Sequence, residues 1–307
     1  MRNIFENRAE DHFIKGVDKS IKKKSEDKLF DEFLLLVIKD RFKARYGNTK
    51  PKRSEFIDVY GKEEVENDGE KLKAFENDVE EMDQKKHAAE AFEAIVIEES
   101  MKSAWMGRNA RVTPTNKFDD VFNKVDCVAE ITNQNETQEL GIAIDITFTK
   151  DENDITRKLD GIKKHIDQGH APALIKYFKD KDGNPRKLLV PKVIIGCNAD
   201  TLRELINLTV QKTSENEIIW KKAEHELNFH YFQTILLNEM LIQVKAFCQY
   251  AESKGQEKTR NSYYKAQKIL EGIIEGKALY EEQIKKTEVK NDVVCNTINE
   301  YAKNLNK

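Results

Sequence analysis

Two short segments, KVDCVAEI at 124–131 and GIAIDITF at 141–148, decide the fold of this chain. Each segment is rich in β-branched residues, as is typical of strands, and the polar stretch NQNETQE separates them. We therefore predict two neighbouring strands, over 125–132 and 141–148.

The alternation of side chains along these strands brings two acidic residues together. Residues two apart point to the same face of a strand, so Asp126 is expected on one face of the first strand, and Asp145 and Thr147 on the matching face of the second. The opposite faces are almost wholly apolar. A carboxylate in the middle of a buried strand is costly unless a cation or a hydrogen-bond partner offsets its charge. Asp145 therefore requires a partner, and a divalent cation would supply one.

Elements of both kinds surround the two strands. Apolar residues at helical spacing predict one helix from about 84 to 106 and another from 155 to 166. Two more strands are expected at 173–178 and 188–196, joined by the turn DKDGNP at 180–185. The middle of the chain is thus predicted to form a mixed α/β core.

Helices are predicted on both sides of this core. Periodic apolar residues indicate helices in roughly the first 80 residues, a helix at 201–210 and an almost wholly helical segment from 217 to the end. We predict an α/β fold in which helices sandwich a mixed central β-sheet. The expected regions are a helical N-terminal extension (1–84), the α/β core (85–212) and a helical C-terminal region (213–307).

Composition excludes several classes of protein. Of the 307 residues 35% are charged, and the formal net charge is −3. The longest uninterrupted apolar stretch, 33–38, is far shorter than the ~18 residues of a membrane-spanning helix, so we expect a cytoplasmic protein without a membrane partner. The four cysteines form no CxxC pair and the histidines lack zincin spacing, which argues against a zinc site and a disulfide framework.

The nearly balanced charge conceals a strong asymmetry along the chain. Residues 61–100 contain 14 acidic and 5 basic side chains, whereas residues 157–192 contain 10 basic and 4 acidic ones. Local field, more than net charge, governs the binding of nucleic acid. The side chains expected to contact phosphates lie on or around the two later strands: Lys176, Lys179, Lys181, Arg186 and Lys187.

The order of these elements resembles the PD-(D/E)XK nuclease superfamily, whose members have a restriction-endonuclease-like fold. An acidic helix precedes an Asp that opens one strand (KVDCVAEI), an acid stands at the centre of the next strand (AIDIT), and a basic helix and two further strands follow. The resemblance covers about residues 85–210. It implies hydrolysis of DNA phosphodiester bonds with Mg²⁺, for which Mn²⁺ would substitute.

In that family the two strand acids bind Mg²⁺, often with a glutamate of the preceding helix. Carried over, the resemblance implies that Asp126 and Asp145 are metal ligands and catalytic residues. Glu99 is the expected helix ligand because it shares a helix face with apolar residues, and Glu98 and Glu93 are weaker alternatives.

The lysine of the family motif, which positions or polarises the attacking water, is absent. Thr147 stands at its position, and a hydroxyl can orient water but brings no positive charge. The following helix offers Lys158 and Lys163, which flank its apolar stripe and can reach inward, either as catalytic residues or merely snorkelling from a core-facing helix. Asp120, in the loop before the first strand, is a further candidate ligand near the metal.

Two functions are compatible with these residues. The first is a Mg²⁺-dependent endonuclease acting on DNA, for which double-strand cleavage by one site per chain would require a homodimer. The alternative is a catalytically inactive relative that binds nucleic acid or protein. The Thr at position 147 favours the alternative.

Overall fold

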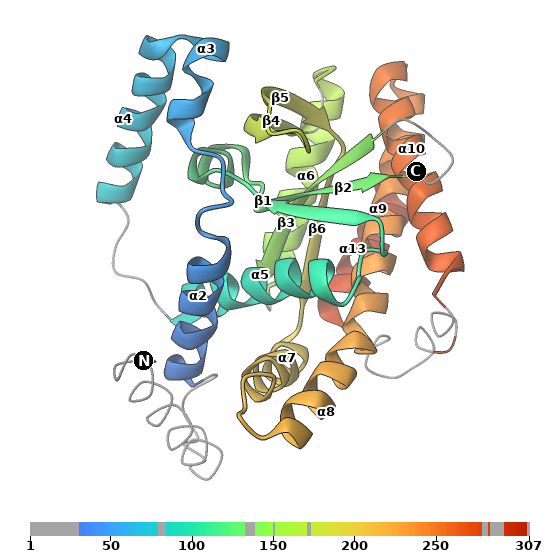
Figure 1. The fold of residues 1–307 in the computed structure, drawn as a ribbon. Coiled ribbons are helices and arrows are strands. Elements are labelled where there is room, and N and C mark those ends of the chain that lie inside the picture. The colour runs from blue at the N-terminus through green and yellow to red at the C-terminus, as the bar shows by residue number, and fades with distance from the viewer. Residues whose placement is uncertain are drawn as a thin grey trace.

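A mixed four-stranded β-sheet lies at the centre of the molecule (Figure 1). Its strands, in spatial order, are β1 (Ala110–Pro114), β2 (Cys127–Thr132), β3 (Glu139–Phe148) and β6 (Lys192–Cys197). β2 pairs in antiparallel fashion with both β1 and β3, and β6 pairs with β3 in parallel. The computed structural model describes residues 31–78, 84–132, 139–149, 151–170, 173–277, 282 and 292–305.

A second, two-stranded sheet crosses one face of the first. It consists of β4 (Ala173–Lys179) and β5 (Pro185–Val190), which pair in antiparallel fashion. A Cβ atom placed on Gly141 of β3 would lie 2.9 Å from Val190 Cγ1, so the absence of a side chain at position 141 permits this close crossing.

One predicted strand is divided in the structure. The segment 188–196 was expected to form a single strand, but β5 ends at Val190 and β6 begins at Lys192 in the other sheet. Pro191 lies at the division, and proline has no N–H with which to continue a ladder. The five-residue strand β1 was not predicted, because a segment so short shows little periodicity.

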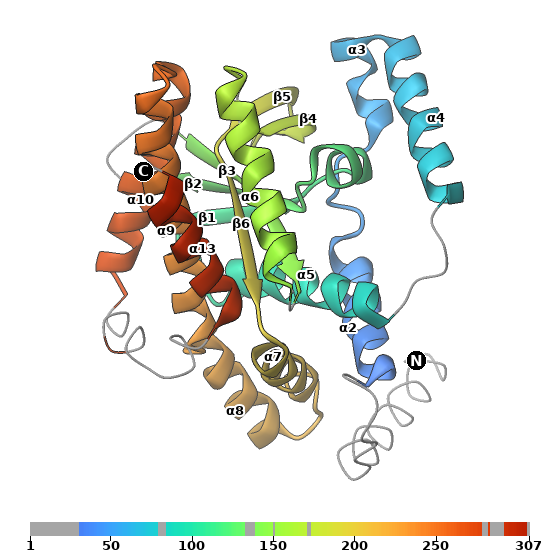
Figure 2. The ribbon, with the colours of Figure 1, turned by 180° about the vertical axis from the view of Figure 1, so that it is seen from behind.

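Helices cover both faces of the central sheet, which confirms the predicted mixed α/β class. The helix α5 (Gln84–Lys102) packs on β1 and β3 and lies in front of the sheet in Figure 1. The helices α6 (Glu152–Asp167) and α13 (Val293–Leu305) pack on β6 and face the viewer in Figure 2.

Further helices flank this arrangement. On the N-terminal side are α2 (Glu32–Tyr46), the 3₁₀ turn η1 (Arg53–Phe56), α3 (Ile57–Tyr60) and α4 (Lys62–Asp78). On the C-terminal side are α7 (Ala199–Gln211), α8 (Glu217–Asn228), α9 (Phe232–Ser253) and α10 (Glu257–Glu275).

The main hydrophobic core is continuous through the molecule. It runs from Leu34 in α2, through the faces of β2 and β3 that carry Cys127 and Ile144, to Ile298 in α13. The core thus crosses the boundaries predicted at 84/85 and 212/213, and those boundaries stay a prediction. The opposite faces of β2 and β3 carry Val128 and Ala143, which pack in a smaller core with β4 and β5.

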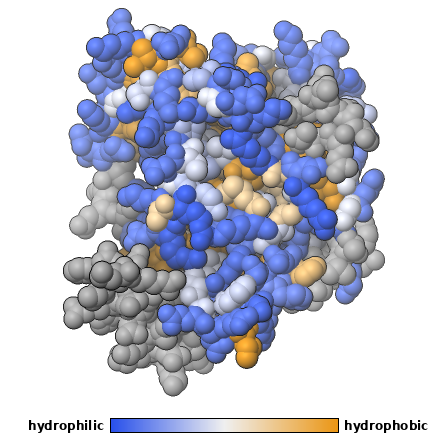
Figure 3. Space-filling view, viewed as in Figure 1, coloured by the Kyte–Doolittle hydropathy of each residue, from blue (hydrophilic) through white to orange (hydrophobic). Residues whose placement is uncertain are grey.

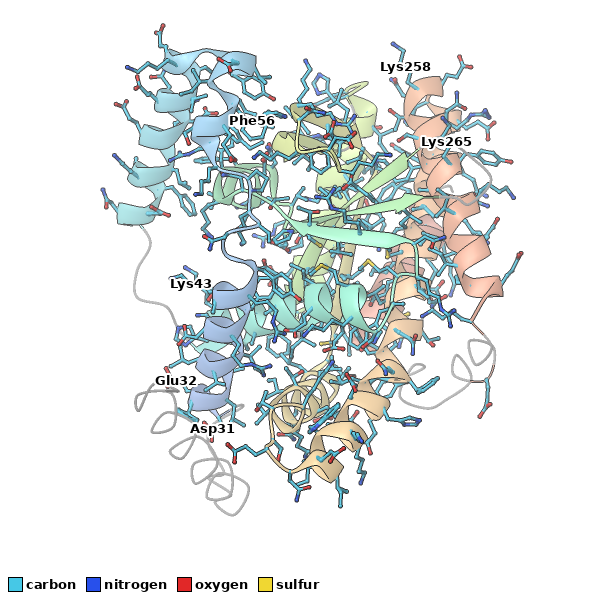
Figure 4. All side chains as sticks on the ribbon, in the orientation of Figure 1. Asp31, Glu32, Lys43, Phe56, Lys258 and Lys265 are labelled. Carbon is cyan, nitrogen blue, oxygen red and sulfur yellow. The ribbon has the colours of Figure 1, made fainter. Side chains whose placement is uncertain are left out.

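On the face seen in Figure 3, polar side chains dominate the described surface, and apolar residues gather in small patches. Lys43 on α2 and Lys258 on α10 point away from the molecule, whereas Phe56 is fully buried (Figure 4). Within the described ranges, no helix has both the length and the apolar character needed to cross a bilayer.

Candidate functional site

Asp145 is a buried carboxylate at the centre of β3, with only 4% of its surface exposed. Its Oδ1 accepts a hydrogen bond from Lys158 Nζ of α6, and its Oδ2 lies 3.2 Å from Lys192 Nζ of β6. Two cations therefore offset the charge of this carboxylate, which would otherwise be costly in the sheet.

Asp126 lies directly before β2, the strand that pairs with β3. That pairing begins with Cys127 opposite Ile144, and the Asp126 N–H donates to the Ile144 carbonyl at 2.9 Å. The Asp145 carboxylate is close enough to raise the pKa of Asp126. The two strand acids thus come from adjacent segments of one sheet, and that their side chains share a face stays a prediction.

The Asp126 carboxylate has a structural contact of its own. Its Oδ2 accepts a hydrogen bond of 2.5 Å from the backbone N–H of Ile146. Burial nevertheless raises the pKa of Asp126 well above its ordinary value, and the nearby carboxylates of Glu93, Asp145 and Asp120 raise it further. Asp126 is consequently protonated more easily than an exposed aspartate, first because it is buried and second because other carboxylates are near.

Glu93 of α5 is a helix acid whose charge raises the pKa of Asp126. Burial raises the pKa of Glu93 to about 7; Lys50, whose Nζ lies 4.0 Å from Glu93 Oε1, lowers it, and Asp120 raises it. Asp120 itself, in the π-helical turn η2 (Asp119–Asn123), pairs with Lys117 at 2.8 Å. The charges of Glu93 and Asp120 thus act on each other and on Asp126, and we call these three residues the acidic set.

The expected helix ligand, Glu99, lies elsewhere. Its carboxylate bonds Lys212 Nζ at 3.0 and 3.1 Å and accepts a hydrogen bond from Ser103 Oγ at 2.6 Å. Glu98 pairs with Arg45 and Lys102. Glu99 shares a helix face with core residues, and this face is turned toward α7 and Lys212. Glu93, one of the weaker alternatives, is the glutamate of α5 whose charge acts on Asp126.

Lys192 was not among the expected catalytic residues. Besides Asp145, its Nζ contacts two backbone carbonyls, those of Lys124 at 2.5 Å and Asn123 at 3.4 Å. Burial lowers its pKa, although the carboxylate of Asp145 acts in the opposite direction. A sequence signal exists, because a lysine directly after Pro191 opens the apolar strand KVIIGC.

The two candidate lysines of α6 have different surroundings. Lys158 reaches Asp145, whereas Lys163 pairs with Asp167 at 3.0 Å and lies 5.2 Å from the ring centre of Tyr250. Hydrogen bonds to Tyr250 and Asp167 raise the pKa of Lys163 to about 12. The structure brings Lys158, and not Lys163, to the strand acids.

Thr147, the residue at the motif lysine position, is buried two residues beyond Asp145 in β3. Alternation along the strand places it on the same face as Asp145. It therefore lies beside the site without bringing a charge to it.

The basic residues expected to bind nucleic acid divide into two groups. Lys176 bonds Glu64 and Asp68 of α4 at 2.5 and 2.6 Å, and Lys179 pairs with Glu55 at 2.7 Å. These contacts hold the N-terminal helices against β4, so Lys176 does not point to solvent as expected. Three others are exposed: Lys181, Arg186 and Lys187.

A cleft of about 930 Å³ opens beside Asp145. Among its described lining residues Asp145 is the one acid, whereas six side chains are basic or are histidines. The cleft thus lies on the cationic side of Asp145, away from the acidic set. Its lining comprises Phe122, Asn123, Lys124, Asp145, Arg157, Lys158, Gly161, Ile162, His165, Gly169, His170, Ala173, Leu174, Leu189 and Lys192.

The donor chemistry of the strand acids fits Mg²⁺. In the part of the chain that is described, no three His, Cys, Asp or Glu side chains are grouped as metal ligands. Mg²⁺, however, is commonly held by one or two carboxylates together with waters and substrate phosphates. Asp126 and Asp145 are two carboxyl groups of the kind that such a site requires, and a bound cation would favour the ionised form of Asp126, whose pKa burial raises.

Comparison of the chain with protein-family models, with curated proteins and with solved structures finds no match.

Proposed function

We propose that this protein is a Mg²⁺-dependent nuclease of PD-(D/E)XK type that hydrolyses phosphodiester bonds in DNA. The observation that carries the proposal is the position of Asp145. This buried carboxylate stands between the acidic set and a cleft lined by cationic side chains. The fold, with its mixed sheet between helices, is compatible with the restriction-endonuclease-like architecture of that superfamily.

The residues around Asp145 have distinct roles in this proposal. Asp126 and Asp145 would hold the metal, which when bound activates water and neutralises charge on the phosphate. Lys158 and Lys192 provide the positive charge that Thr147 does not, and they lie where a phosphate in the cleft would need it. The Thr147 hydroxyl can orient a water molecule, but it carries no positive charge with which to stabilise a developing hydroxide.

A second candidate function, a catalytically inactive module that binds nucleic acid, has one observation in its favour. Lys158 and Lys192 already neutralise Asp145, so this carboxylate does not need a metal to be stable in the sheet. In the nuclease, substrate phosphate competes for the two lysines and frees Asp145. In the inactive module, the ion pairs persist and the cleft binds nucleic acid without cleaving it.

Cleavage of labelled DNA distinguishes the two functions. Asp145→Asn keeps the size of the side chain and removes the charge, so we expect roughly a thousandfold loss of Mg²⁺-dependent cleavage in a correctly folded variant. Asp200→Asn, a change at an exposed acid on α7, is the matched control and should retain activity. Cleavage that survives Asp145→Asn, or a wild-type protein that binds but never cleaves, would contradict the proposal.

A further inference from the structure

The cleft beside Asp145 combines positive charge with exposed apolar surface. Three of its lining side chains are large, apolar and solvent-accessible: Phe122, Leu174 and Leu189, with exposed fractions of 41%, 40% and 57%. Leu174 lies on β4 and Leu189 on β5, whereas Phe122 lies in η2, directly before the lining residues Asn123 and Lys124. Such surface beside a cationic site indicates a ligand with both anionic and apolar parts.

Phe122 is held in a fixed position by other aromatic rings. Its ring centre lies 4.8 Å from that of Phe118 and 6.1 Å from that of Phe75. An exposed ring that neighbouring rings already orient loses little side-chain entropy when a planar ligand stacks on it. Phe122 is consequently suited to be a platform for a base.

The two parts of the lining match the two parts of an unpaired nucleotide. Arg157, Lys158 and Lys192 offer positive charge for phosphates, and the apolar residues offer contact surface for base faces. A duplex presents phosphates on its outside but keeps its base faces stacked within. Duplex DNA would therefore leave Phe122 and Leu189 without an apolar partner.

The dimensions of the cleft lead to the same conclusion. Its volume of about 930 Å³ falls in the ~300–1,000 Å³ range of pockets that enclose a single small ligand. A DNA duplex, whose major groove alone is about 12 Å wide, cannot enter such a space. Gly161 on α6 keeps the wall open, because a Cβ built there meets no described atom within 4 Å.

We infer that the cleft binds an unpaired stretch of nucleic acid, with its bases against Phe122, Leu174 and Leu189 and its phosphates toward Lys158 and Lys192. The substrate of the site is then single-stranded or locally unpaired DNA. The statement about cleavage rests on the proposed function, whereas the statement about binding stands without it.

Binding in the absence of metal tests the inference. Fluorescence anisotropy with EDTA present would compare a labelled oligothymidine strand of about ten nucleotides with a blunt duplex of the same length. We expect the single strand to bind about tenfold more tightly or better, since the stacking of even one base on an aromatic side chain is enough for a factor of this size. Equal or tighter binding of the duplex would overturn the inference.

Two variants locate the binding in the cleft. Leu189→Asp and Gly161→Leu should each weaken binding of the single strand about tenfold, the first by charge repulsion and loss of contact, the second by filling the cleft. The matched control is Ile218→Asp on α8, where an even more exposed apolar residue lies outside the cleft lining. Equal effects of Leu189→Asp and Ile218→Asp would overturn the inference.

The outcomes also separate the inference from the proposed function. Tight, cleft-dependent binding of single strands without cleavage at any Mg²⁺ concentration would support the inference and contradict the nuclease. Cleavage of duplex DNA that depends on Asp145 but is insensitive to Gly161→Leu would support the nuclease and contradict the inference.

Discussion

Lys192 Nζ lies 3.2 Å from Asp145 Oδ2, so a lysine of β6 directly faces the central acid of β3. The side chains of both residues are at least nine-tenths buried. The same ammonium contacts the carbonyl of Lys124, a residue in the left-handed conformation with φ of 53°. Lys192 thus connects the acid at the centre of the sheet to the turn that precedes β2.

Removing Lys192 should destabilise the fold. Lys192→Met leaves Asp145 with Lys158 alone, and breaking a buried ion pair costs about 3–5 kcal/mol when one charge is left behind. We expect the free energy of unfolding, measured by urea unfolding, to fall by an amount near the lower end of this range. The double variant Lys192→Met/Asp145→Asn should lose less than the sum of the single variants. Additive losses would show that the two side chains do not interact.

The two lysines of α6 form a natural pair of test and control. Lys158→Met should reduce Mg²⁺-dependent cleavage about a hundredfold, because its charge faces the site. Lys163→Met should cleave DNA at close to the wild-type rate, because Lys163 pairs with Asp167 beside Tyr250 and does not contact the strand acids. Steady-state cleavage of one DNA substrate by both variants provides the comparison. Similar losses in the two variants would exclude a specific role for Lys158.

Glu93 should make stability depend on pH. Its pKa is about 7 in the folded protein, above the ordinary glutamate value of 4.5, so the folded state binds more protons than the unfolded state between these values. The free energy of unfolding therefore falls by on the order of 2–3 kcal/mol as the pH rises from about 4.5 to 7, and it changes little above pH 7. Glu93→Gln should flatten this dependence in urea unfolding at pH 5 and pH 8. An unchanged slope would contradict the assignment.

Gly161 should be replaceable by alanine with a gain in stability. The residue lies within α6, where glycine costs about 0.5–1 kcal/mol relative to alanine, and the added methyl group meets no described atom. Thermal unfolding of Gly161→Ala should show a higher midpoint. A lower midpoint would mean that the α6 wall of the cleft is more crowded than described.

Much of the fold was predictable because its signals are local. The alternation around Asp126 and Asp145 and the apolar stripe of α6 each depend on residues close in sequence. The division at Pro191 was missed because the apolar run continues through it, although the two halves belong to different sheets.

The site was less predictable because it depends on how elements are rotated against one another. Helical periodicity shows that Glu99 shares a face with core residues, but not that this face meets Lys212, which directly follows α7. Lys158 and Lys163 flank the same stripe symmetrically, and only the position of α9 with Tyr250 distinguishes them. Lys192 enters the site through the parallel pairing of β6 with β3, a long-range contact that no local pattern predicts.

Titration calorimetry with Mn²⁺ tests the central claim most directly, namely that Asp126 and Asp145 together hold a divalent cation. Wild type and Asp200→Asn should show one saturable binding event, and both Asp126→Asn and Asp145→Asn should abolish it while the far-UV circular dichroism stays unchanged. Mn²⁺ binding that persists in both strand variants, or no binding to folded wild type with or without DNA, would contradict the account.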